Sequence, residues 1–153
     1  MLAAVRAHSV DLAVFVHVLG AMTLVGGLVT AVAAGIAGWR DANGALRRFS
    51  ALTLFAVALP GWLIMRLAAD WAYSKEGWDK VPSKFQPNWL GIGFLTADVG
   101  GIVLLIALVL GGIGIRRMRS GGGTRLLRAS TALAAILIAV YIVAVWAMGG
   151  KPS

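Results

Sequence analysis

Residues 12–39 read LAVFVHVLGAMTLVGGLVTAVAAGIAGW, and this stretch decides the fold. It contains no Asp, Glu, Lys or Arg, and His17 is the one titratable side chain within it. A helix needs about 20 mostly apolar residues to cross the hydrocarbon core of a bilayer. Because lipid offers no partners to the backbone of an open strand, the stretch is predicted to be a transmembrane helix.

Three further segments have the same character, at residues 49–69, 90–115 and 126–148. The chain has 153 residues, of which 59% are hydrophobic and 13% charged, whereas about a quarter of residues are charged in soluble domains. We therefore predict an all-α, polytopic membrane protein. The whole chain, 1–153, forms one up-down-up-down bundle of four transmembrane helices.

Arginines mark one side of this bundle. The two short connections, 40–48 and 116–125, are rich in arginine, whereas the longer connection 70–89 carries lysines offset by acidic residues. The positive-inside rule places both arginine-rich connections in the cytoplasm and both termini outside. The net charge of +8 thus lies beside apolar spans, which predicts contacts with anionic membrane lipids and no binding of nucleic acid.

The sequence contains no cysteine, which excludes disulfides, thiolate metal sites and thiol catalysis. No complete catalytic motif is present, and Ser50 and Ser130 lie at the helix ends far from His17. These features favour a non-enzymatic function. The 20 glycines are typical of close helix packing in membranes, and they predict a homo-oligomer or a subunit of a larger membrane complex.

His17 and Asp98 each lie on a helix stripe shared with small residues, and such stripes form the seams of close-packed bundles. Both side chains are therefore expected to face the bundle interior, with Asp98 paired or protonated. The stripe through His17 comprises Ala13, His17, Gly20, Leu24, Gly27, Ala31, Ala34 and Gly38. The stripe through Asp98 comprises Gly91, Phe94, Asp98, Gly101, Leu105, Leu108 and Gly112.

The rise of 1.5 Å per helical residue places these polar side chains at similar depths. His17 lies about 9 Å and Asp98 about 12 Å below the outer ends of their helices. Arg66 lies about 6 Å and Tyr141 about 10 Å below theirs. With Trp62 one turn from Arg66, these residues predict a polar pocket between the helices in the outer leaflet. Pro60-Gly61 predicts a kink beside it, and an Arg66–Asp70 pair is the simplest local contact.

Three classes of function are compatible with this pocket. In the first, His17, Asp98, Arg66, Tyr141 and Trp62 bind a small apolar ligand or a cofactor such as haem or a quinone. In the second, His17 and Asp98 carry a metal ion or a proton, with His17 as the metal ligand. In the third, the polar residues only hold the bundle together, and the protein is an accessory or assembly subunit.

The outer connection is aromatic, with two prolines that restrict its backbone. The aromatic residues form either an interfacial belt or a lid over a site that opens outward. They are Trp71, Tyr73, Trp78, Phe85 and Trp89.

The run from His17 to Gly27, HVLGAMTLVGG, resembles the first-helix signature of bacterial membrane proteins related to copper-resistance protein D. The four-span size and the closing segment from Trp146 to Pro152, WAMGGKP, resemble a neighbouring family of small bacterial integral membrane proteins. The resemblance implies a multi-pass protein of the bacterial inner membrane. It also implies that His17 is the residue of functional interest.

Overall fold

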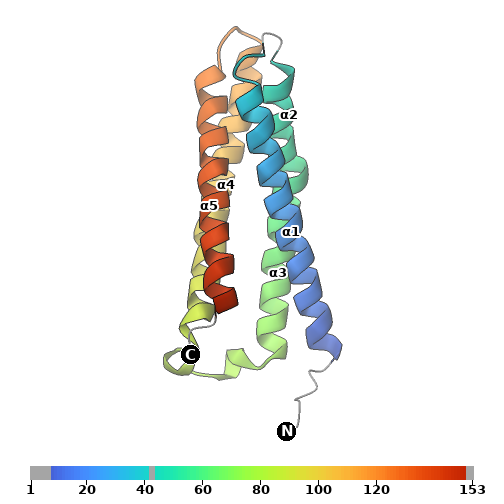
Figure 1. The fold of residues 1–153 in the computed structure, drawn as a ribbon, viewed down its shortest axis with the longest axis vertical. Helices are drawn as coiled ribbons and strands as arrows, with labels where there is room; N and C mark the ends of the chain where they lie inside the picture. Colours follow the sequence, from blue (N-terminus) through green and yellow to red (C-terminus); the bar gives the residue numbers. More distant parts are fainter. Residues whose placement is uncertain (1–7, 42–43, 151–153) are drawn as a thin grey trace.

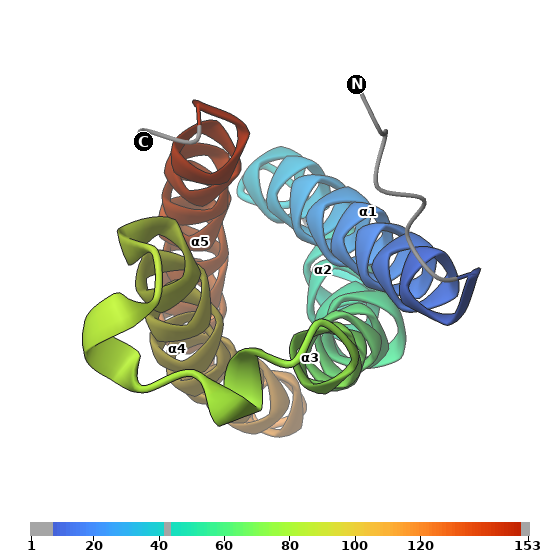
Figure 2. The same ribbon diagram turned by 90° about the horizontal axis from the view of Figure 1, so that it is seen from below.

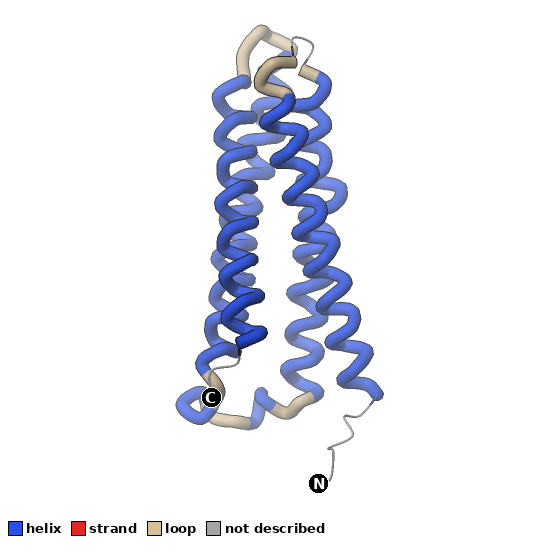
Figure 3. Tube along the Cα trace, viewed as in Figure 1, coloured by secondary structure: helices blue, strands red, loops and turns tan. Residues whose placement is uncertain are grey.

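The computed structural model describes residues 8–41 and 44–150, and its regular elements are all helical (Figures 1 and 3). Four helical stretches are long and apolar enough to cross a membrane: Val10–Ala37, Ala45–Lys75, Asn88–Met118 and Thr124–Trp146. This confirms the all-α class and the four predicted spans. The elements are α1 (His8–Ala37), α2 (Ala45–Thr53), π-helical η1 (Leu54–Ala58), α3 (Leu59–Lys75), α4 (Asn88–Met118) and α5 (Thr124–Gly150), with the short 3₁₀ turns η2 (Trp78–Lys80) and η3 (Ser83–Phe85) before α4.

The helices differ from the predicted apolar spans at their ends: α1 begins earlier but ends at Ala37 instead of residue 39, and the other three extend at both ends. The second span begins at Ala45 instead of residue 49 and continues to Lys75 instead of residue 69. Backbone chemistry sets these limits more than hydropathy does: Gly44 (φ 69°) precedes the helix and Gly77 (φ 78°) follows it, both in the left-handed region that favours glycine. Residues 1–7 lie outside the described residues, and so does the end of the closing segment from Trp146 to Pro152.

The connections rich in arginine lie together at one end of the bundle, shown at the top of Figure 1. Residues 76–87 lie at the opposite end, which is also the end where α1 begins. Helices α1 and α3 pack as one pair and α4 and α5 as another, while α3 and α4 contact each other sparsely. In Figures 1 and 2 the two pairs are close at the arginine end and diverge toward residues 76–87.

Small residues bring α1 and α3 into close backbone contact. A Cβ atom added to Gly20 would lie 2.8 Å from Met65 Cα, and one added to Gly61 would lie 2.9 Å from Leu24 Cα. The predicted seam of α1 is confirmed, because six of its eight residues are buried and His17 and Ala34 are half-buried. The largest fully buried side chains complete the core: Leu24, Leu28, Leu54, Leu104 and Leu137.

A kink is predicted at Pro60-Gly61, and the structure shows a π-helical turn just before this proline. Proline has no backbone N–H and its ring crowds the carbonyl four residues earlier. The helix widens just before it, over Leu54–Ala58, where the Leu59 N–H donates to the Leu54 carbonyl five residues back. Such single π turns are common at functional positions, and this one lies between the arginine end and the part of α3 that carries Arg66.

Large apolar side chains cover the outside of the bundle. Phe15 (63% exposed), Leu67 (68%) and Leu95 (66%) are among more than thirty such residues. Soluble monomers rarely expose contiguous apolar surfaces of this extent. The outer surface is therefore suited to lipid, in agreement with the four candidate spans.

Candidate functional site

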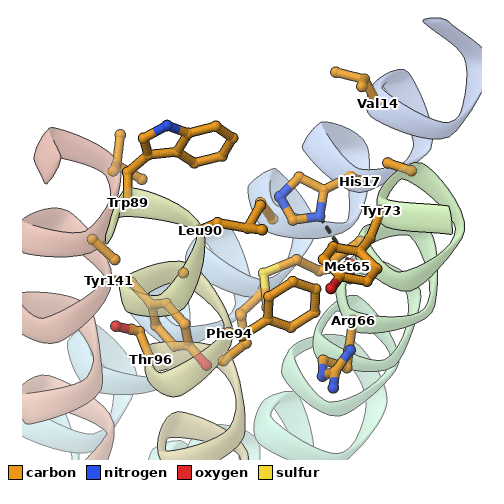
Figure 4. Close-up of a pocket in the computed structure, with 18 of the residues that line it drawn as sticks. Val14, His17, Met65, Arg66, Tyr73, Trp89, Leu90, Phe94, Thr96 and Tyr141 are labelled. Carbon is orange, nitrogen blue, oxygen red and sulfur yellow. Dashed lines mark hydrogen bonds between the residues drawn. The ribbon is translucent and has the colours of Figure 1, made fainter. Parts of the chain in front are cut away.

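A cavity of about 540 Å³ lies where the two helix pairs diverge. This volume is within the range of small-molecule binding sites. All four long helices contribute to its mostly apolar wall, and residues of the connection 70–89 line one end (Figure 4). Its lining includes Val14, His17, Ala21, Leu24, Val25, Met65, Arg66, Tyr73, Glu76, Trp78, Trp89, Leu90, Phe94, Thr96, Ala97, Tyr141 and Val145.

His17 presents a defined ring nitrogen to this cavity. Its Nδ1 lies 2.9 Å from the Met65 carbonyl oxygen, and because a carbonyl can only accept, Nδ1 carries the proton in this contact. In the neutral imidazole Nε2 then holds a lone pair. Figure 4 shows this second nitrogen facing the side of the cavity where Leu90 lies.

Two residues that carry hydroxyl groups, Thr96 and Tyr141, line the opposite wall, formed by α4 and α5 (Figure 4). The Tyr141 side chain is only 6% exposed, and its hydroxyl has no hydrogen-bond partner in the structure. That hydroxyl lies against Gly100, where a Cβ would be 2.5 Å from it, so only glycine leaves room for the ring. Thr96 also lines the cavity.

Thr96 differs from the helical threonines elsewhere in the bundle. Thr23, Thr30, Thr53 and Thr131 each donate their hydroxyl to the carbonyl four residues earlier, the usual arrangement in apolar surroundings. No such contact forms at Thr96 within the part of the chain that the structure describes. Its hydroxyl is therefore available to a ligand.

Arg66 connects the two helix pairs on the α3–α4 side. Its Nε donates to Asp98 Oδ1 at 2.8 Å, and its Nη1 pairs with Asp70 on the same helix. Its guanidinium also lies 5.0 Å from the centre of the Phe94 ring. The predicted Arg66–Asp70 pair is confirmed, and so is the expectation that Asp98 is paired.

The prediction that Asp98 faces the bundle interior is wrong. Its side chain is 56% exposed, and it does not line the cavity. The buried stripe of α4 is displaced by one residue and runs through Ala97, Gly100, Leu104 and Ala107. Because Asp98 lies at the edge of this stripe, it reaches Arg66 across the helix pairs instead of pointing inward.

Trp62 likewise lies outside the cavity lining. Its indole Nε1 donates to the Ala97 carbonyl oxygen at 2.9 Å, and its ring occupies the space that a side chain at Gly101 would fill. Trp62 therefore joins α3 to α4 beneath the Arg66–Asp98 pair. Of the five residues predicted to form the pocket, the structure brings His17, Arg66 and Tyr141 to the cavity.

The aromatic residues of the connection 70–89 divide into two groups. Tyr73, Trp78 and Trp89 line the cavity, whereas Phe85 is 68% exposed. Gln86 organises this segment, because its Nε2 lies 2.8–3.0 Å from three acceptors, namely the Tyr73 hydroxyl and the carbonyls of Trp78 and Val81. One group thus covers the cavity, as a lid would, and the other faces outward.

Sequence reasoning missed Met65, Thr96 and Phe94 as cavity residues. Met65 and Thr96 carried no signal, because a methionine and a threonine are ordinary within an apolar span. Phe94 was placed on the stripe of Asp98, and its position one turn from that residue was the available clue. It is held by a T-shaped contact with Tyr73, with ring centres 5.3 Å apart.

Metal binding receives no support from the arrangement of side chains. No group of three or more His, Cys, Asp or Glu side chains with a metal-binding arrangement occurs among the described residues. His17 offers one nitrogen, and the carboxylate predicted to help it is held by Arg66 instead.

Together these features define a helical bundle of membrane-spanning character with a partly open, mostly apolar cavity at one end. Comparisons with known protein families, with curated proteins and with solved structures find no match.

Proposed function

We propose that this protein binds a neutral, largely apolar ligand of the quinone type in the cavity between its helix pairs. The observation that carries the proposal is the pattern of available polar atoms. An acceptor, His17 Nε2, lies on one wall, and the other wall is lined by Thr96 and by Tyr141, whose hydroxyl is buried without a partner. Apolar pockets with a few placed polar groups are typical of small-molecule sites.

The charges around the cavity favour a neutral ligand over haem. Haem carries two propionates, yet Arg66 is already paired with two carboxylates, and Glu76 adds another carboxylate to the lining. One observation keeps haem as the second candidate: the Met65 side chain lines the same cavity as His17, and a His–Met pair is a known axial ligand set.

The ligand is proposed to reach the cavity from the lipid. The polar contacts Arg66–Asp98 and Trp62–Ala97 bridge the α3–α4 side, whereas α1 and α5 diverge at this end in Figures 1 and 2. Val145 of α5 lines the cavity and is 63% exposed. An apolar molecule dissolved in the bilayer can thus enter between α1 and α5.

The location completes the proposal. In accordance with the resemblance described above, we place the protein in the bacterial inner membrane, with the arginine-rich connections in the cytoplasm and the cavity in the outer half of the bilayer. The proton or metal carrier and the accessory subunit are the alternatives. The carrier is less favoured, because Asp98 is held by Arg66 and does not line the cavity.

Organic extraction of the purified protein tests the binding proposal. We expect a quinone to copurify at near-stoichiometric amounts, identified by chromatography and mass spectrometry of the extract. A Soret absorbance band that disappears in His17→Ala would instead establish haem. Neither a ligand nor any increase in melting temperature with added decylubiquinone would contradict the proposal.

The Tyr141 hydroxyl gives a sharper prediction. In the ligand-free protein, Tyr141→Phe is expected to raise the unfolding free energy by about 1 kcal/mol, since a buried hydroxyl without a partner is destabilising. The same change is expected to weaken ligand binding about fivefold through loss of a hydrogen bond. Thermal unfolding and ligand titration of both proteins measure the two effects, and unchanged affinity would exclude the hydroxyl as a ligand contact.

The proposed orientation in the membrane can be measured by labelling single introduced cysteines. The chain has no cysteine of its own that would react with the label. Ser120 and Ser83 are exposed at opposite ends of the bundle. We expect a membrane-impermeant maleimide to label Ser83→Cys in intact spheroplasts and to label Ser120→Cys only after lysis. The reverse pattern would invert the topology.

A further inference from the structure

We infer that the cavity prefers the reduced, hydroquinone form of its ligand over the oxidised form, and that His17 sets this preference. The inference rests on the proposed function, because it concerns the same cavity and the same class of ligand. It follows from the direction of one hydrogen bond, between His17 and the backbone of α3.

The Met65 carbonyl fixes the tautomer of His17. With Nδ1 donating to that oxygen at 2.9 Å, the neutral ring can only accept a hydrogen bond at Nε2. No other hydrogen bond or ion pair of His17 occurs in the part of the chain that the structure describes. The atom that His17 offers to a ligand, Nε2, can therefore accept a hydrogen bond but cannot donate one.

The two redox forms of a quinone differ in whether they can donate a hydrogen bond to such an acceptor. The oxidised ring presents two carbonyl oxygens, which only accept, whereas the reduced ring presents two hydroxyls, which donate and accept. A carbonyl placed against His17 Nε2 sets two acceptors against each other, and a hydroxyl in the same position donates to it. An unsatisfied polar pair in an apolar site weakens binding substantially.

The opposite wall does not discriminate between the two forms. The hydroxyls of Thr96 and Tyr141 can donate to a carbonyl, and they can equally donate to or accept from a hydroxyl. The charged groups at this end do not reverse the preference, because Arg66 already donates to Asp98 and Asp70. Glu76 also lines the cavity, and its Oε2 already accepts a hydrogen bond from Trp78 Nε1. The preference is therefore assigned to His17.

Titration with one ring in both redox states tests the inference. The full-length protein in lipid nanodiscs is titrated with decylubiquinone and, under argon with a reductant, with decylubiquinol. We expect decylubiquinol to bind about tenfold more tightly, the size of one hydrogen bond to a buried group. A tenfold preference corresponds to a midpoint potential about 30 mV higher for the bound couple than for the free couple.

His17→Asn is the decisive variant. An asparagine amide nitrogen can occupy the place of Nδ1 and still donate to the Met65 carbonyl, but no atom replaces Nε2. We expect His17→Asn to retain its melting temperature and to bind both forms with equal affinity. Met22→Leu, on the same helix at a position 68% exposed and outside the cavity lining, is the matched control and should keep the preference.

The outcomes separate this inference from the proposal on which it rests. Binding of neither form by the original protein contradicts the proposed function itself. Binding of both forms with equal affinity leaves that function standing and overturns the redox preference. A preference that persists in His17→Asn overturns the role of His17. If His17→Asn does not fold, His17→Phe, which keeps a ring of similar shape without either nitrogen, serves in the same comparison.

Discussion

Gly20→Ala and Gly61→Ala are each expected to destabilise the protein, although each adds a single methyl group. At both positions the new Cβ atom would meet helix backbone, 2.8 Å from Met65 Cα or 2.9 Å from Leu24 Cα. Backbone atoms cannot rotate away as a flexible side chain can, so α1 and α3 must separate. Overpacking of this kind typically costs about 1–3 kcal/mol per site, which is a large fraction of the stability of a small protein.

The matched control lies on the same helix. Gly26 has nothing within 4 Å of the position that a Cβ would occupy. Gly26→Ala should therefore be neutral or slightly stabilising, since alanine is the better helix former. Thermal unfolding in lipid nanodiscs, followed by far-ultraviolet circular dichroism, compares the three variants. If Gly61→Ala and Gly26→Ala unfold at the same temperature, the close approach of α1 and α3 does not stabilise the bundle.

Hydropathy was sufficient to predict the helical class and the four spans, because each span is an uninterrupted apolar run. The seam of α1 was predictable for the same reason, since its small residues recur at helical spacing through Ala13, Gly20 and Gly27. The helix ends were not predictable from hydropathy. Amphipathic turns at both ends of the second span, such as the one containing Arg47, extend the helix beyond its apolar part.

The position of Asp98 shows where periodicity becomes insufficient. Two stripes of α4, one through Asp98 and one through Ala97, both contain glycines. The two stripes are offset from each other by one residue in the sequence. The sequence could not decide which of them faces the core. The contact between Tyr141 and Gly100, a glycine of the Ala97 stripe, decides it, because the tyrosine ring of α5 occupies the space at that glycine.

The sequence predicted which end of the bundle carries the candidate site, but it predicted only some of the residues that line the cavity. His17, Arg66 and Tyr141 lie at the cavity because ionisable and polar side chains are rare in apolar spans and stand out. Thr96 became a candidate only through a missing contact, the intrahelical hydrogen bond that four other threonines make. The absence of a contact is a property of the three-dimensional structure, so no sequence pattern could have shown it.

Arg66→Leu is expected to destabilise the bundle by about 2–3 kcal/mol, the cost of an unpaired charged residue within a membrane-spanning helix. The reason is that Arg66 is the partner of both Asp98 and Asp70. Its removal leaves a carboxylate on α4 facing lipid, and it also removes the polar bridge between the diverging helix pairs. Thermal unfolding in nanodiscs measures the loss, and Arg66→Lys, which keeps the charge with a single donor group, should be intermediate.

The double variant Arg66→Leu with Asp98→Leu distinguishes charge neutralisation from packing. With both charges removed, no carboxylate remains unpaired on α4, and two leucines suit the lipid-facing edge where Asp98 is now 56% exposed. We expect the double variant to regain most of the lost stability, as replacement of an ion pair by apolar residues often does. A double variant as unstable as Arg66→Leu alone would show that Arg66 acts through its contact with Phe94, whose ring centre lies 5.0 Å from the guanidinium. Regained stability together with weakened ligand binding would show that the ion pair holds the cavity in shape.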